Sequence, residues 1–458
     1  MTSTRTEEGD RKPIGKIEFG RLMAAVGPFE KHPRLAVACS GGPDSMALTI
    51  LMHEWARARS GGVTALIVDH GIRKNAAAEA RLVAKRLAQR NIPHKILKHT
   101  GKVFEGDIQA SARKVRYALL SDWCAAHSHL HLGIAHHRED QAETVLLRLA
   151  RGSGLDGLAA MASVSETRHI RHIRPLLNVP RSQLRATLNK HGVCFVEDPS
   201  NDDRDFARVR MRALAAPLSA EGMSPYRLAA TATRLARARA ALEGSVAALL
   251  ARAGTFFPQG YGLLAFAPLR RAPEEIALRG LSRTLTYIGG KEYPSRLAHL
   301  ERLYEWILRD PMTGGKTLSG CRILARGSSL LVCRESAAAK TVLPARGEVF
   351  WDNRFRLHCP PRGTGEVKRL GSEGWREIVA ADPGLRNTKI PAVVRPSLPA
   401  IWSAKGVEAV PHLGFTRQNR NSAIISKRPV CFAPRQPLIP ASFTLQKGGY
   451  TLSKLRRN

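Results

Sequence analysis

Short apolar runs alternate with amphipathic stretches along the chain from Arg34 to about Val196. This alternation is typical of βαβ units whose strands form a parallel sheet. The apolar runs predict strands at Leu35–Cys39, Ala65–Asp69, His94–Leu97 and Leu130–Ala135. The amphipathic stretches predict helices at Ser45–Arg57, Ala77–Gln89 and Gln109–His127, and another that begins near Glu139. Residues 34–216 are therefore predicted to form a doubly wound α/β nucleotide-binding domain, after an N-terminal extension over residues 1–33.

The pattern changes in the second half of the chain. Residues 217–313 are rich in Ala, Leu and Arg at helical spacing, which predicts a mostly helical domain with a basic exposed face. Residues 314–458 carry short runs of Val, Leu and Phe separated by Gly and Pro, as at 322–324, 330–333 and 354–359. These runs predict a small β-rich or mixed C-terminal domain.

The balance of charge indicates a polyanionic partner. The 458 residues include 72 Lys and Arg against 38 Asp and Glu, a formal net charge of +34. Nucleic acid is the leading candidate because its phosphates release counterions when cations bind them. A generally basic surface and an anionic membrane are the alternatives. Both basic regions, 217–313 and 314–458, are therefore predicted to bind nucleic acid.

Cysteine usage and hydropathy predict a cytoplasmic protein without a membrane span. The 7 cysteines are scattered and contain no CxxC pair, which fits a reducing compartment. The first residues carry Glu7, Glu8 and Asp10 and lack the apolar core of a signal peptide. No later run approaches the roughly 20 apolar residues that a spanning helix needs.

A glycine turn follows the first predicted strand. Gly41 and Gly42 allow backbone N–H groups to approach an anion, and Pro43 suits the first position of a helix whose dipole also favours phosphate. No lysine occupies the place that a Walker A loop requires, so ordinary P-loop chemistry is excluded. The alternative is a tight strand-to-helix turn in which Ser45 only caps the helix.

Acidic and imidazole groups cluster after two other predicted strands. Asp69 ends the second strand, where an open α/β sheet forms its ligand crevice, although an ordinary turn residue also suits that place. His136, Asp140 and Glu143 have the spacing of one helix face. Such a face suits Mg²⁺ or the ammonium group of a lysine. Two alternatives are the usual preference for acids in a first helical turn and a zinc site.

Arginines at short spacing are candidates for phosphate contacts. Arg113 and Arg116 lie three apart on a predicted helix, where a solvated basic face is the alternative for the intervening Lys114. Three further arginines alternate at 208, 210 and 212. On an extended segment these would point to one side, whereas on a helix they would fan out.

These segments together resemble a known family. Ser40-Gly41-Gly42-Pro43-Asp44-Ser45 resembles the PP-loop of the ATP pyrophosphatase superfamily. The segments 67–73, 136–144 and 197–212 follow in the order found in tRNA(Ile)-lysidine synthetases, so the resemblance spans about 34–212. Val209 departs from the family, which usually has Asn there.

The resemblance implies a ligase that forms a carbon–nitrogen bond and splits ATP into AMP and pyrophosphate. ATP would adenylate the C2 carbonyl oxygen of the wobble cytidine in the isoleucine tRNA with a CAU anticodon. The ε-amine of free lysine would then displace AMP, which changes the codon read from AUG to AUA. Three rivals are a related tRNA cytidine thiolase, a PP-loop enzyme of small metabolites, and a non-catalytic RNA-binding protein. The resemblance leaves open whether the enzyme is a monomer or a homodimer.

The resemblance also implies roles for individual residues. ATP would contact Ser40, Gly41, Gly42, Pro43, Asp44, Ser45 and Asp69. Mg²⁺ would be held by Asp44, and free lysine by Asp140 and Glu143. The catalytic set would be Asp44, Arg116, His136, Asp140 and Glu143, with His136 near the nucleotide or metal. The tRNA would contact Arg113, Arg208, Arg210 and Arg212.

Overall fold

The computed structural model describes residues 12–69, 71, 76–99, 108–167, 169–195, 207–309, 314–361, 363–417 and 430–440. They divide into two compact units, the first ending at Ala241 and the second covering Leu242–Pro440. The boundary falls within one long helix, α11 (Pro225–Ala253). No helix in these described ranges is both long and apolar enough to cross a membrane.

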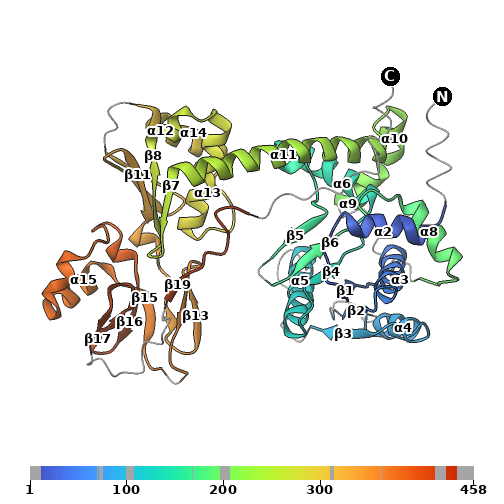
Figure 1. Ribbon diagram of the computed structural model, residues 1–458, viewed down its shortest axis with the longest axis horizontal. Coiled ribbons are helices and arrows are strands. Elements are labelled where there is room, and N and C mark those ends of the chain that lie inside the picture. Colours follow the sequence, from blue (N-terminus) through green and yellow to red (C-terminus); the bar gives the residue numbers. More distant parts are fainter. Residues whose placement is uncertain are drawn as a thin grey trace. The chain divides into compact units, whose positions relative to one another are not determined.

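The first unit contains a six-stranded sheet with the order β3-β2-β1-β4-β6-β5 (Figure 1). Its strands are β1 (Arg34–Ala38), β2 (Gly62–Asp69), β3 (His94–Lys98), β4 (His131–Gly133), β5 (Val164–Glu166) and β6 (Arg171–Ile173). All neighbours are parallel except β5, which runs antiparallel to β6. The chain moves outward from β1 in both directions, so the predicted doubly wound α/β fold is confirmed.

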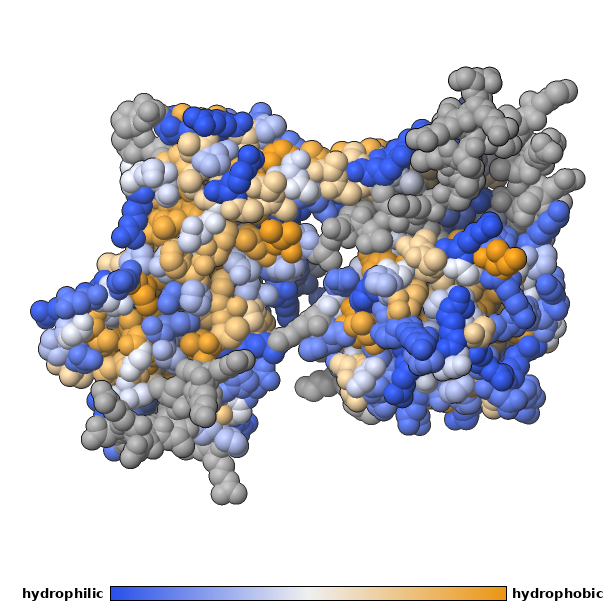
Figure 2. All heavy atoms as spheres, viewed as in Figure 1, coloured by the Kyte–Doolittle hydropathy of each residue, from blue (hydrophilic) through white to orange (hydrophobic). Residues whose placement is uncertain are grey.

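Helices cover both faces of this sheet because successive side chains of a strand point to opposite faces. Leu35 and Val37 of β1 pack in one core, whereas Ala36 packs in another with Leu120 of α5. The helices are α2 (Lys16–Ala24), α3 (Pro43–Arg57), α4 (Ala76–Ala88), α5 (Ile108–Ala126), α6 (Arg138–Leu149), α7 (Leu155–Leu158), α8 (Arg181–Lys190), α9 (Ala207–Ala213) and α10 (Ala215–Ala220). Hydrophilic residues dominate the face of this unit seen in Figure 2.

The predicted N-terminal extension contributes to this domain. Phe19 and Met23 of α2 are buried in the core that also holds α3 and β1. The backbone N–H of Ile14 donates to the hydroxyl of Thr187 in α8 at 3.0 Å. Residues from about 14 onward therefore pack as part of the α/β body.

The second unit combines helices with three antiparallel sheets. The first sheet has the order β7-β8-β11-β10-β9, from β7 (Gly254–Phe257), β8 (Tyr261–Ala265), β9 (Gly315–Leu318), β10 (Cys321–Arg326) and β11 (Ser329–Arg334). Helices α12 (Phe266–Arg271), α13 (Glu274–Gly289) and α14 (Leu297–Leu308) share a core with it. β7 and β8 lie in the segment predicted to be helical, so this sheet combines strands from both sides of the predicted boundary at 313/314.

Two further sheets confirm the predicted β-rich texture of the C-terminal region. One has the order β12-β15-β16-β17-β18 and the other β13-β14-β19. Their strands are β12 (Leu343–Pro344), β13 (Glu348–Trp351), β14 (Phe355–His358), β15 (Glu366–Arg369), β16 (Pro399–Ser403), β17 (Gly406–Val410), β18 (Phe415–Thr416) and β19 (Val430–Phe432). A helix, α15 (Gly371–Ala381), packs beside β17.

Candidate active site

The glycine turn joins the end of β1 to the start of α3. Gly41 has a φ of +87°, and a Cβ atom there would lie 2.3 Å from Cγ2 of Val83 in α4. The hydroxyl of Ser45 donates to the carbonyl of Gly42 at 3.0 Å and accepts the backbone N–H of Ser40 at 3.2 Å. Ser45 therefore closes the loop by bonding both of its ends. Helix α3 begins at Pro43, two residues before the predicted start and at the position that suits a proline.

Gly41→Ala is expected to destabilise the protein by about 1–3 kcal/mol and to weaken ATP binding. The substitution places a side chain in the left-handed region of φ and against Val83. Urea unfolding and ATP titration would measure the two effects. Gly20→Ala in α2 is the matched control, because a Cβ atom there meets nothing within 4 Å. Unchanged stability of the Gly41 variant would contradict the packing argument.

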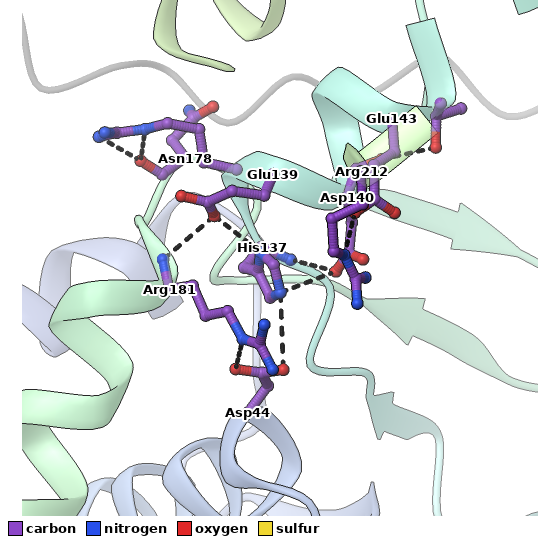
Figure 3. Close-up of polar contacts among 10 residues, drawn as sticks. Asp44, His137, Glu139, Asp140, Glu143, Asn178, Arg181 and Arg212 are labelled. Carbon is purple, nitrogen blue, oxygen red and sulfur yellow. Dashed lines mark hydrogen bonds and ion pairs between the residues drawn. The ribbon is translucent and has the colours of Figure 1, made fainter. Parts of the chain in front are cut away.

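Three carboxylates surround the side chain of His137, which comes directly before α6 (Figure 3). Its Nε2 lies 3.5 Å from Oδ2 of Asp44 and 3.5 Å from Oδ2 of Asp140, and its Nδ1 lies 2.8 Å from Oε2 of Glu139. Burial alone would lower the pKa of His137, but the hydrogen bonds to Asp44 and Glu139 and the charge of Asp140 raise it to about 10. His137 is therefore an imidazolium at neutral pH.

The same cluster keeps Asp44 ionised. Burial would raise the pKa of Asp44, but the hydrogen bond and charge of His137, together with Arg181 and Arg185, bring it below its ordinary value. Nε of Arg181 lies 3.9 Å from Oδ1 of Asp44 (Figure 3). This oxygen is buried and has no hydrogen-bond partner in the described part of the chain. The loop thus offers an anionic oxygen beside the place for phosphate.

The protein is expected to lose stability as the pH rises from 7 to 10, and His137→Gln is expected to lose less. The folded-state pKa of about 10 lies above the ordinary 6.5. The stabilisation is therefore complete below pH 6.5 and is lost as the pH rises through 10. The difference of about 3.5 units corresponds to at most about 5 kcal/mol. Denaturant unfolding in EDTA across this range would measure it, and parallel pH profiles for the two proteins would contradict it.

Glu143 lies on α6 and pairs with Arg212 of α9. Nε of Arg212 donates to Oε1 of Glu143 at 2.9 Å, and the exposed fractions of the two side chains are 41% and 7%. Burial raises the pKa of Glu143 above its ordinary value, although Arg212 opposes that shift. Oε2 of Glu143 is buried without a hydrogen-bond partner among the described residues. One oxygen of this carboxylate therefore remains for another donor.

A cavity of about 160 Å³ opens beside this pair. Its charged lining consists of His137, Glu139, Glu143, Arg181 and Arg212. Its apolar lining comes from α6, α9, α10, the N-terminal end of α11 and the short connection before that helix, through Ala142, Leu146, Met211, Ala215, Leu218, Met223, Pro225 and Leu228. The cavity therefore combines carboxylates with walls that suit an aliphatic chain.

His136 lies apart from this carboxylate cluster. Helix α6 begins at Arg138, so His136 precedes it and does not share its face with Asp140 and Glu143 as the spacing predicted. Instead, Nε of Arg174 donates to Nδ1 of His136 at 3.2 Å. Burial, followed by the charges of Arg174, Arg113 and Arg208, holds the pKa of His136 well below its ordinary range. This imidazole is therefore neutral at physiological pH.

Three further predicted residues of the described ranges lie on β2 and α5. Oδ1 of Asp69 accepts the backbone N–H of Gly71 at 3.1 Å at the end of β2. Arg113 lies over the ring of Tyr117 at 5.1 Å on α5, where Arg116 is exposed. The segments 72–73 and 196–206 of the proposed motifs lie outside the described residues, as does His70.

The three alternating arginines lie on helix α9, so their side chains do not all point to one side. Arg208 and Arg212 are four apart on α9 and share a face, and the charge of Arg208 acts on both His136 and Glu143. Arg210 points away from that face.

Sequence reasoning did not assign roles to His137, Glu139, Arg174 and Arg181. His137 is the second His of the pair at 136–137, and Arg181 is the first residue of α8 after Pro180. Within the described ranges no group of three or more His, Cys, Asp or Glu side chains is arranged to hold a metal ion. The zinc alternative therefore gains no support there.

The sequence is similar to a family of known domains and to several proteins of one name. Residues 15–218 match the family described as PP-loop domain. The tRNA(Ile)-lysidine synthase of Ruegeria pomeroyi is 38% identical over 88% of this chain and 94% of its own. The protein of that name from Wolbachia pipientis is 34% identical over 85% and 90%, and the one from Rhodopseudomonas palustris is 40% identical over 70% and 96%.

Proposed function

The chain belongs to the tRNA(Ile)-lysidine synthase family, ligases of the PP-loop superfamily that use ATP, and from this we propose which groups it joins and which residues do so. The substrates are free lysine and the wobble cytidine of isoleucine tRNA with a CAU anticodon. The observation that carries the proposal is the cavity lined by Glu139 and Glu143, which lies beside Asp44 of the PP-loop. Asp44 supplies an ionised carboxylate for the nucleotide, and Glu143 supplies a carboxyl group for an amine.

The PP-loop and Asp44 serve the adenylation of tRNA. The loop backbone and the N-terminus of α3 suit the pyrophosphate of ATP, which leaves as the C2 oxygen of cytidine attacks the α-phosphorus. The buried Oδ1 of Asp44 fits Mg²⁺, a cation that proteins usually hold through one or two carboxylates plus substrate phosphates. Bound Mg²⁺ would neutralise charge on the departing pyrophosphate.

Glu143 and the cavity serve the transfer of lysine. The apolar walls suit the four-carbon stem of lysine, and the free Oε2 of Glu143 suits an ammonium group. The ε-amine must lose a proton before it attacks C2 and displaces AMP. Glu143 is the favoured base because burial raises its pKa. Asp140, held between His137 and the helix N-terminus, is the second candidate for contact with lysine.

The tRNA itself is proposed to contact the exposed arginines of α5 and α9 and the two C-terminal regions. The net charge of +34 supports this assignment. No feature of the site favours thiolation, the nearest rival, since the 7 cysteines contain no CxxC pair.

Labelled lysine is expected to enter unmodified isoleucine tRNA when ATP and Mg²⁺ are present. A tRNA with another base at the wobble position is the control. One AMP released for each lysine incorporated, and only with the cytidine-bearing tRNA, is the expected result. AMP release without lysine incorporation would keep the PP-loop chemistry but reject lysine as the nucleophile.

A further inference from the structure

Arg174 links the end of β6 to His136 at the end of β4. Besides its bond to Nδ1 of His136, its Nη1 donates to the carbonyl of Ala162 at 2.9 Å and to the hydroxyl of Ser165 at 3.1 Å. Its backbone N–H donates to the carbonyl of Ser163 at 2.8 Å. The acceptors at Ala162 and Ser165 therefore fix the guanidinium, and its Nε points toward the imidazole of His136.

This contact determines where the proton of His136 lies. An arginine is always a donor and never an acceptor, so Nδ1 of His136 must present its lone pair to Nε of Arg174. A neutral imidazole carries one proton, which then has to be on Nε2. Among the described residues, the charges that act most strongly on His136 are those of Arg174, Arg113 of α5, Arg208 of α9 and the adjacent His137, all of them cations. They oppose a second proton on the ring.

We propose that Arg174 is a positioning residue that holds His136 as the neutral imidazole with its proton on Nε2. In the reaction proposed above, on which this inference rests, His136 then serves as a hydrogen-bond donor and not as the base. The donor stands after β4, the neighbour of β1, at the strand ends where a parallel sheet presents its ligands. Such a donor suits the negative charge of the phosphate that joins AMP to the cytidine. Removal of the lysine proton is left to a carboxylate.

Nuclear magnetic resonance of the full-length protein labelled with [¹⁵N]histidine tests this tautomer directly. Long-range ¹H–¹⁵N correlation distinguishes a protonated ring nitrogen from an unprotonated one. The signals of His136, among the 16 histidines, are identified by their absence in His136→Gln. The expected result is an unprotonated Nδ1 and a protonated Nε2 that do not change between pH 5 and pH 8. A proton on Nδ1 anywhere in this range would overturn the proposal, and this result needs no variant of Arg174.

Arg174→Gln tests whether the arginine is the cause. The variant is expected to give a mixture of tautomers at His136 that titrates within this pH range. The kcat of lysine transfer should fall about 10- to 100-fold, while the KM for lysine stays unchanged. Arg171→Gln is the matched control, since Arg171 also lies on β6 but contacts Glu166, the carbonyls of Gly27 and Pro28 and Nδ1 of His131, and not His136. An unaltered tautomer in Arg174→Gln would refute the role of Arg174.

The tautomer of His136 and the identity of the nucleophile are tested by independent measurements. The spectrum of His136 is recorded without substrates, so it does not depend on which nucleophile the enzyme uses. Absence of lysine incorporation together with the expected tautomer would reject the proposed substrate and keep the positioning role. Normal lysine incorporation together with a protonated Nδ1 would keep the proposed substrate and reject the positioning role of Arg174.

Discussion

Asp44→Asn is expected to lower both pyrophosphate and AMP release by about 10³-fold while leaving tRNA affinity largely intact. The amide keeps the shape of the side chain but removes the charge that faces His137 at 3.5 Å and Arg181 at 3.9 Å. It also removes the anionic oxygen proposed to hold Mg²⁺. Product release from labelled ATP and a separate tRNA-binding titration would measure the two properties.

The control for this variant is Asp122→Asn, which removes one negative charge from an exposed position on α5. That variant should keep its turnover. Retained turnover in Asp44→Asn would remove Asp44 from the site. Equal losses of turnover and tRNA affinity, with a lower unfolding temperature, would indicate damage to the fold instead.

Much of the α/β fold could be predicted because its strands are short apolar runs between amphipathic helices. Strands β1, β2 and β3 and helices α3, α4 and α5 lie within a few residues of their predicted positions. β5 and β6 were missed because each has only three residues, too few to show a period. β7 and β8 were missed within a segment read as helical from its Ala, Leu and Arg content. β7 pairs with β8, and β8 pairs with β11, which lies far along the chain.

The candidate site was predictable where its chemistry is local. The glycine turn and Ser45 are adjacent in sequence, and the structure brings them together as one closed loop. Spacing misplaced His136 because α6 starts two residues later, which leaves His137 to meet the carboxylates. Arg174 and Arg181 come from beyond α6, and no local period connects them with His136 or Asp44. Only tertiary structure supplies those partners.

Glu143→Gln is expected to separate the two halves of the reaction. The amide keeps an oxygen for Arg212 but loses the negative charge proposed to receive the ammonium of lysine. A charged hydrogen bond of this kind contributes about 1.5–3 kcal/mol, so the KM for lysine should rise about 10- to 100-fold. Pyrophosphate release should continue, because it precedes the step in which lysine takes part. Adenylated tRNA should therefore accumulate.

The amounts of pyrophosphate and AMP released distinguish the loss of Glu143 from damage to the PP-loop. Damage to the PP-loop would reduce both products together, as in Asp44→Asn, whereas loss of the lysine site should reduce only AMP. Destabilisation is not the expected cause, since burial disfavours the charge that the substitution removes and Arg212 is 41% exposed. Glu166→Gln is the control, because Glu166 also pairs with an arginine but lies 47% exposed on β5. An unchanged KM for lysine in Glu143→Gln, with pyrophosphate release slowed, would assign Glu143 to adenylation.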